Sequence, residues 1–222
     1  MVRQVPEAIA RGGRGPLTAV IEEVLATPPR PAGGKVIGSS REDRPILGWR
    51  LGGGETAISL IGGCHADEPV GPDLLRRLCA WLGRQPPGNP LLTRYRWSVV
   101  PHVNPDGEDR NRAWSRVTVP VADHRGADDR GFDLATYLFE VVRELPGDDV
   151  EFGFPRDAKD SGARVENRAV ARFLAAGAPY ALHASLHGMG FAPGVWFLLE
   201  EAWEERTRGL RRLLAERAGQ MG

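Results

Sequence analysis

The feature that most constrains the fold is a short apolar run that leads directly into a polar turn. Residues 57–61 contain a single polar side chain, Ser59, and the sequence Gly-Gly-Cys-His-Ala-Asp-Glu follows at residues 62–68. A run of this length bounded by glycines predicts a buried strand. In open α/β sheets, ligands bind at the carboxyl ends of the strands. We therefore expect a functional site at His65 and Glu68.

Strand and helix patterns alternate along the chain. The strand at residues 57–61 is followed by an amphipathic helix pattern over 74–82 and by a second strand pattern over 95–100, the order of a βαβ unit. We also expect an outer helix at 17–25, an edge hairpin over 36–51, strands at 181–186 and 195–199, and helices near 134–145, 165–174 and 200–217, with an irregular loop over 108–133. The predicted class is α/β, with a mixed, mostly parallel β-sheet flanked by helices.

The charge balance excludes several classes of partner. Lys and Arg total 29, as do Asp and Glu, so nothing in the net charge favours nucleic acid or an anionic membrane. The content of 41% apolar and 26% charged residues is typical of a globular protein. We predict a single domain over residues 1–222, in which 1–32 form an N-terminal helix and linker and 33–222 form the core.

The sequence also gives an expectation about location. No run approaches the roughly eighteen apolar residues of a transmembrane helix, and residues 1–14 lack the apolar segment of a secretory leader. Only Cys64 and Cys79 could form a disulfide. We expect a reduced, cytoplasmic protein, and the sequence leaves its oligomeric state open.

Three residues form a candidate metal-binding set. His65 and Glu68 lie three positions apart, but a catalytic zinc ion needs three protein ligands, and the pair alone is also compatible with a capped turn. His187 ends a second apolar strand and is followed by Gly188. The alternative for His187 is a core residue, although His183 and Ser185, which share its strand face, are better candidates for that role.

Four ordered motifs resemble those of the zinc metallocarboxypeptidases of the carboxypeptidase A type. They are residues 62–68, Asn-Pro-Asp-Gly at 104–107, Asn-Arg-Ala-Trp at 111–114 and Ser-Leu-His at 185–187. The resemblance implies a zinc-dependent hydrolase that cleaves a C-terminal peptide bond. It also implies that His65, Glu68 and His187 bind one Zn²⁺ per chain, and that Arg112 polarises the scissile carbonyl and stabilises the oxyanion.

The chain departs from the family pattern where the substrate's terminal carboxylate would bind. The family sequence Asp-x-Asn-Arg is replaced at residues 133–136, where Ala135 and Thr136 stand in place of Asn and Arg. Arg125, Arg130 and Arg164 are candidate replacements. Just after the third ligand, Gly188 and Met189 stand in place of the family's substrate-pocket residues.

The general base is a second departure. In the family a glutamate well beyond the third ligand takes the proton from the zinc-bound water, whereas this chain ends at Gly222. The resemblance therefore implies a C-terminally shortened fold that lacks the last strands. Glu200 and Glu201 are the nearest carboxylates, but we expect them to begin a helix. Without the base, the chain is expected to bind metal with little turnover.

Two further functions stay open. An N-acyl amino acid deacylase of the aspartoacylase and succinylglutamate desuccinylase type shares the Gly-x-His-x-x-Glu opening, so the substrate is expected to be a peptide or an acyl amino acid. A non-catalytic zinc-binding domain is the other alternative. Asp106 is a candidate partner of a zinc-bound histidine, and Cys64 is expected to be a small core residue.

Overall fold

The computed structural model describes residues 16–118, 134–145, 147–157, 159–188, 198–199 and 201–221. It divides the chain into two compact units, Met1–Gly188 and Met189–Gly222. The single domain over residues 1–222 stays a prediction.

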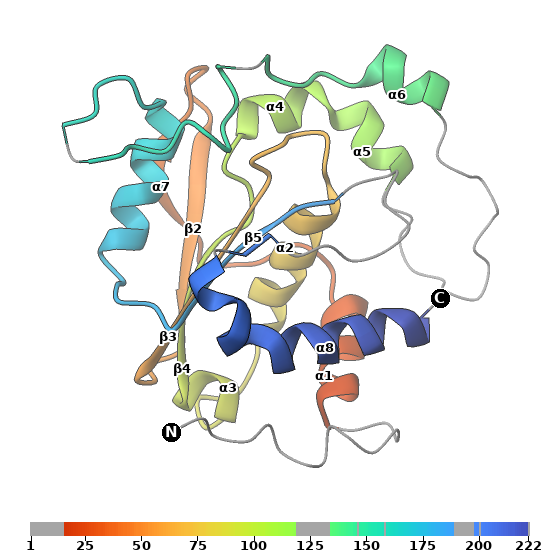
Figure 1. The fold of residues 1–222 in the computed structure, drawn as a ribbon, viewed down its shortest axis with the longest axis vertical. Coiled ribbons are helices and arrows are strands. Elements are labelled where there is room, and N and C mark those ends of the chain that lie inside the picture. The colour runs from red at the N-terminus through yellow and green to blue at the C-terminus, as the bar shows by residue number, and fades with distance from the viewer. Residues whose placement is uncertain are drawn as a thin grey trace. The chain divides into compact units, whose positions relative to one another are not determined.

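The first unit alternates strands and helices, as the sequence predicts (Figure 1). Its elements are α1 (Pro16–Ala26), β1 (Lys35–Ser39), β2 (Pro45–Leu51), β3 (Thr56–Gly62), α2 (Val70–Leu82), α3 (Pro90–Thr93), β4 (Tyr95–Val100), α4 (Pro105–Arg110), α5 (Arg112–Thr118), α6 (Leu134–Glu140), α7 (Val165–Ala175) and β5 (Leu182–Leu186). The second unit contains the 3₁₀ helix η2 (Glu201–Trp203) and the helix α8 (Glu204–Met221).

The described strands form one mixed sheet in the order β1-β2-β4-β3-β5. The predicted edge hairpin is confirmed, because β1 and β2 pair antiparallel, and β2 continues antiparallel to β4. The inner strands β4, β3 and β5 are parallel. Parallel neighbours end at the same edge of a sheet, so the residues that follow β3 and β5 meet there.

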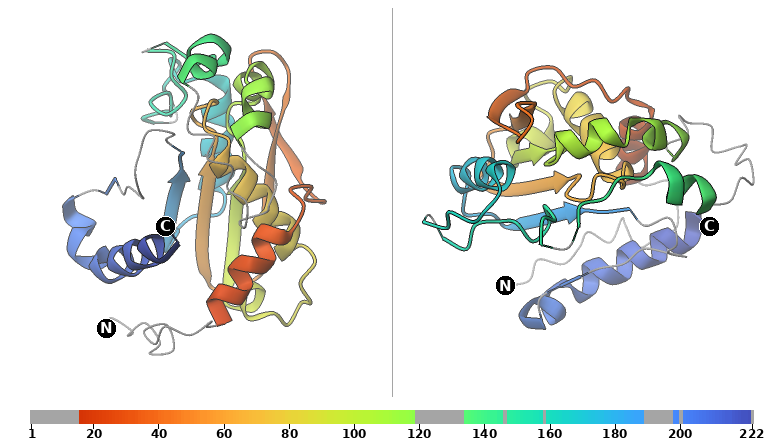
Figure 2. Two further views of the ribbon diagram at one scale, coloured as in Figure 1. Left: turned by 90° about the vertical axis from the view of Figure 1, so that its right-hand side faces the viewer. Right: turned by 90° about the horizontal axis from the view of Figure 1, so that it is seen from above.

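Helices cover both faces of this sheet, and the alternation of side chains along β4 shows how. Val99 packs in a buried cluster with Leu75 of α2, whereas its neighbour Val100 packs in another with Ala169 of α7. Successive strand residues point to opposite faces, so both clusters are parts of one two-sided core. In Figure 2, α1 and α2 lie together on one side of the sheet.

The sequence-based expectation of an irregular loop over residues 108–133 is wrong at its beginning. Residues 105–110 and 112–118 form α4 and α5. Asn104 caps α4, because its Oδ1 accepts a hydrogen bond from the Gly107 amide at 3.0 Å, and Pro105 suits the first helical position. Residues 119–133 lie outside the described part of the chain, as does most of the predicted strand at 195–199.

Two further predicted helices are present, one of them with different bounds. The predicted C-terminal helix is present as η2 and α8, and α6 ends at Glu140, earlier than the pattern suggested. Of the helices that the structure describes, none combines the length and the apolar character that crossing a membrane requires.

Candidate metal centre

The turn after β3 positions the first two candidate ligands. Gly63 adopts a φ of +70°, and a Cβ atom at this position would lie 2.5 Å from Nδ1 of His102. Only glycine fits both the backbone conformation and the space. The turn is closed by a hydrogen bond from the Glu68 amide to the His65 carbonyl at 3.3 Å. His65 and Glu68 therefore project from a tightly held turn.

The third candidate ligand comes from the neighbouring strand. Gly62 of β3 is paired with Leu186 of β5, so His187 emerges beside the turn that carries His65. The first turn of α2 packs closely there, since a Cβ atom on Gly71 would lie 2.6 Å from the Leu186 carbonyl oxygen. Two segments far apart in the sequence are thereby brought to one point.

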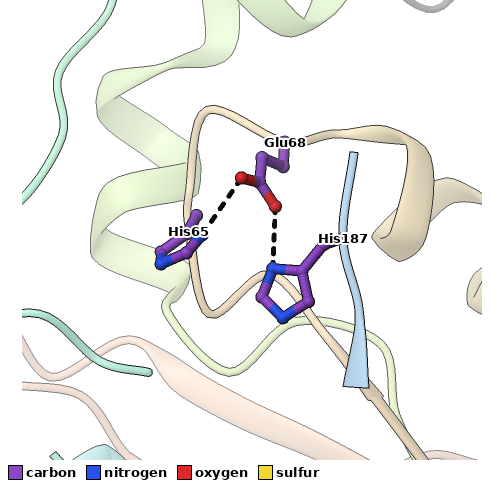
Figure 3. Close-up of side chains that lie close together, drawn as sticks. All are labelled: His65, Glu68 and His187. Carbon is purple, nitrogen blue, oxygen red and sulfur yellow. Dashed lines mark hydrogen bonds and ion pairs between the residues drawn. The ribbon is translucent and has the colours of Figure 1, made fainter. Parts of the chain in front are cut away.

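The imidazoles of His65 and His187 converge on the Glu68 carboxylate (Figure 3). Oε1 of Glu68 lies 3.0 Å from Nδ1 of His65, and Oε2 lies 2.9 Å from Nδ1 of His187. The Gly188 amide also donates to Oε2, at 3.1 Å. One potential ligand atom from each of the three residues lies within 4.8 Å of the others. The structure thus brings together all three residues predicted as metal ligands.

The electrostatics of this cluster suit a cation. Burial alone would raise the pKa of Glu68, but hydrogen bonds from His187 and His65 outweigh it and lower that pKa to about 2. The carboxylates of Glu151 and Glu68 raise the pKa of His187 to about 10, and Glu68 raises that of His65. Two imidazoles with one ionised carboxylate are a donor set that Zn²⁺ takes.

Two carboxylates that the sequence analysis did not single out lie behind the imidazoles. Oδ2 of Asp149 is 3.4 Å from Nε2 of His65, and Oε2 of Glu151 is 3.0 Å from Nε2 of His187. The Ser185 hydroxyl also lies 3.0 Å from Nε2 of His187. Each ring thus has Glu68 at its Nδ1 and another carboxylate at its Nε2.

A guanidinium group beside the centre was also missed. Nη2 of Arg143 lies 3.7 Å from Oε1 of Glu68, and its Nη1 lies 3.2 Å from Oδ2 of the buried Asp67. The Tyr137 hydroxyl donates to the same Asp67 oxygen at 3.1 Å, and the Trp114 indole donates to the Asp67 carbonyl at 2.9 Å. The Arg143 side chain is 40% exposed, so it adds an accessible positive charge next to Glu68.

Arg112, predicted to stabilise the oxyanion, lies at the start of α5. Its side chain is 66% exposed and forms an ion pair with Asp109. Among the described residues, no hydrogen bond or ion pair joins Arg112 to the three candidate ligands. Its catalytic role stays a prediction.

Other predicted residues have structural partners. Asp106 accepts from the Ser40 hydroxyl at 2.5 Å and pairs with Arg44 at 2.9 Å, so it holds the β1–β2 turn against α4. Arg164 is buried and contacts Asp148 and Glu166.

The remaining candidates are either in the core or outside the described residues. Cys64 is buried in the core as expected, and His183 bonds Ser59 at 2.7 Å. Arg125, Arg130, Met189 and Glu200 lie outside the described residues.

Comparisons with known proteins identify the family to which this fold and this donor set belong. A model described as zinc carboxypeptidase matches residues 17–192. The chain therefore belongs to the zinc carboxypeptidase family, whose metal is zinc, and the resemblance seen in the sequence is confirmed.

Individual relatives match shorter segments. Carboxypeptidase D of Rattus norvegicus is 37% identical over 86 residues, which cover 37% of this chain and 6% of that protein. Zinc carboxypeptidase A 1 of Drosophila melanogaster is 33% identical over 105 residues, covering 41% of this chain and 24% of that protein. A protein of Talaromyces marneffei named an inactive metallocarboxypeptidase is 29% identical over 97 residues, covering 36% of this chain and 16% of that protein.

The solved structures support the fold. A putative carboxypeptidase from Burkholderia mallei has a TM-score of 0.51 and 16% identity, and the match covers 88% of this chain and 45% of that one. This chain thus spans less than half the length of that neighbour, and the segments it shares with the curated relatives above cover at most 24% of theirs. The predicted α/β fold class is confirmed.

Proposed function

We propose that this chain is a zinc-dependent hydrolase that releases the C-terminal residue of a peptide by attack of a metal-activated water. The observation that carries the proposal is the convergence of His65, Glu68 and His187, with ligand atoms within 4.8 Å of one another. Zinc in such a His₂Glu site lowers the pKa of its bound water to about 7 and polarises carbonyl groups.

The chain's own residues have distinct parts in this proposal. His65, Glu68 and His187 would hold one zinc ion, and the Gly188 amide, 3.1 Å from Oε2, keeps the Glu68 carboxylate in place. Negative charge develops on the carbonyl oxygen in the transition state, and a fixed guanidinium nearby stabilises it. Arg112 is the family's candidate for this role, whereas Arg143 is the guanidinium that lies 3.7 Å from Glu68.

Variants distinguish the two arginines. If Arg143 stabilises the developing charge, Arg143→Gln lowers kcat by about 10²-fold or more with little change in KM, while Arg112→Gln has little effect. The opposite pattern would assign the role to Arg112.

Turnover is expected to be slow. Among the described carboxylates near the centre, Asp149 and Glu151 each already contact an imidazole Nε2, so we assign neither as the general base. General base catalysis contributes about 10²–10⁴-fold, so a centre with no base assigned among its described residues is expected to hydrolyse slowly.

A deacylase is the second candidate. It is favoured by the replacement of the family's carboxylate-binding Asn-Arg pair by Ala135 and Thr136. The substrate of such an enzyme would be an N-acyl amino acid.

One assay separates the candidates. The zinc-loaded chain is incubated with peptides carrying free or amidated C-termini and with N-acyl amino acids. We expect zinc-dependent release of the last residue from peptides with a free C-terminus only. Turnover of N-acyl amino acids alone would favour the deacylase, and no turnover by a chain that binds zinc would indicate a non-catalytic zinc-binding domain.

A further inference from the structure

In the segment at residues 148–151, the side chains of Asp149 and Glu151 point to the metal centre, while those of Asp148 and Val150 point elsewhere. Asp149 and Glu151 reach the imidazoles of the metal centre, while Val150 between them is fully buried in the core with Val170 of α7. The preceding Asp148 points to a third set of partners and pairs with Arg41 at 2.7 Å and with Arg164 at 3.1 Å. The two carboxylates that face the centre are therefore separated by a residue that anchors the segment.

Hydrogen bonds to the rest of the fold hold this segment firmly. The buried Arg164 donates from Nη1 to the Asp148 carbonyl at 2.6 Å, and Asn167 donates from Nδ2 to the Val150 carbonyl, also at 2.6 Å. The Glu151 amide donates to Oδ1 of Asp149 at 2.7 Å. This last bond leaves Oδ2 of Asp149 directed at Nε2 of His65. The carboxylates are thus oriented by groups outside the metal centre.

An imidazole has two nitrogens, and a hydrogen bond at one decides what the other can do. A carboxylate at Nε2 favours the tautomer that carries the proton there, which leaves the lone pair on Nδ1. In both rings Nδ1 is the atom that faces Glu68. A carboxylate partner also makes the imidazole a stronger ligand and restricts rotation of the ring.

We propose that Asp149 and Glu151 are positioning residues, which orient His65 and His187 through Nε2 and so set the affinity of the centre for zinc. This inference rests on the proposed zinc-dependent function, because it concerns the same metal centre. Glu151 has the larger effect, since its contact with His187 is 3.0 Å whereas that of Asp149 with His65 is 3.4 Å. Loss of such a partner typically weakens metal binding by about 10–100-fold.

The test measures zinc affinity by competition with a chromophoric chelator at pH 7. It uses the full chain and the variants Glu151→Gln, Glu151→Ala and Asp149→Asn. We expect Glu151→Ala to weaken zinc binding by about 10–100-fold, and Glu151→Gln to weaken it less because the amide oxygen can stay beside Nε2 of His187. Asp149→Asn should weaken it by about 10-fold or less.

Asp148→Asn is the matched control, because Asp148 lies on the same segment but contacts Arg41 and Arg164 instead of a histidine. It should bind zinc as the wild type does. Exchange of the imidazole Nε2 proton of His187 with water, followed by NMR in the zinc-loaded chain, gives a second readout that does not depend on activity. This exchange should be slow in the wild type and faster in Glu151→Ala, which removes the carboxylate 3.0 Å from Nε2.

Two of the possible results would refute the positioning role, and a third would refute the proposed zinc-dependent function. Zinc affinities of the Glu151 and Asp149 variants equal to that of the wild type would overturn the positioning role. A loss in Asp148→Asn as large as in Glu151→Ala would also overturn it, because the effect would then come from the fold of the segment. A wild-type chain that binds no zinc would instead refute the proposed function itself.

Discussion

Asp67 and Glu68 are adjacent carboxylates with different surroundings. Glu68 faces two imidazoles, while Asp67 turns away and meets Arg143 and the Tyr137 hydroxyl. The Asp67 side chain is only 4% exposed, and the guanidinium of Arg143 lies 3.2 Å from its Oδ2. Arg143 thus has a structural partner in Asp67 and an electrostatic one in Glu68.

Removing Arg143 should therefore cost stability. We expect Arg143→Gln to lower the free energy of unfolding by about 1–3 kcal/mol, a value reduced for the exposure of Arg143, because a buried charge loses its partner. The double variant Asp67→Asn/Arg143→Gln should recover part of this loss, since no unpaired charge is left. Urea denaturation of the metal-free protein measures both. Equal stability of Arg143→Gln and the wild type would show that Asp67 does not depend on Arg143.

The sequence predicted some members of the centre and missed others for a physical reason. His65, Glu68 and His187 directly follow the apolar strands β3 and β5, so a local pattern places them at the sheet edge. Asp149 and Glu151 lie in a segment without periodicity, and the distant Arg164 and Asn167 fix its position. No local signal could have revealed that packing.

At the scale of elements, the centre depends on how α2 meets the sheet. The first turn of α2 approaches the last residue of β5 so closely that a Cβ on Gly71 would lie 2.6 Å from the Leu186 carbonyl oxygen. His187 follows that residue directly. The distance between α2 and β5 therefore helps to set the position of the third ligand.

Widening that distance should disturb both stability and metal binding. We expect Gly71→Ala to lower the free energy of unfolding by about 1–3 kcal/mol, because backbone must move to remove the clash. It should also weaken zinc binding by about 10-fold or more as His187 shifts. Gly88→Ala, where a Cβ would meet nothing within 4 Å, is the control and should change neither quantity. Unchanged zinc affinity in Gly71→Ala would show that the contact between α2 and β5 does not set the position of His187.

The sequence predicts most of the helices and strands that the structure contains. The apolar runs of β3 and β4 and the amphipathic pattern of α2 gave the βαβ unit because each element carries its own period. α4 was missed because Asn-Pro-Asp-Gly is a common turn sequence and also a good helix start. The cap formed by Asn104 with the Gly107 amide decides between them.

For the whole molecule, a buried histidine links stability to pH. His102 packs beneath the turn at Gly63, and burial lowers the pKa of its imidazole to about 4. In the unfolded chain the pKa of histidine is about 6.5. Between these two values the unfolded chain binds a proton that the folded chain does not. The contribution of His102 to the free energy of unfolding is therefore fully present above pH 6.5 and is lost as the pH falls toward 4.

A variant isolates this contribution from the other titrating groups. His102→Asn keeps an acceptor for the Asn104 amide, which bonds Nδ1 of His102 at 3.2 Å. We expect the stability difference between the wild type and His102→Asn to shrink by up to about 3 kcal/mol from pH 7 to pH 4. Urea titrations at several pH values measure it. A difference that stays constant with pH would show that His102 titrates normally.

Zinc binding tests the central claim most directly, and elemental analysis with calorimetric titration measures it at neutral pH. The wild-type chain should bind one zinc ion, and His187→Ala should lose it, while His183→Ala, on the same strand but bonded to Ser59, should keep it. Zinc at about 100 times its dissociation constant should add about 2.7 kcal/mol to the stability of the wild type. A wild type that binds no zinc, or a His187→Ala variant that binds it equally well, would contradict the proposed centre.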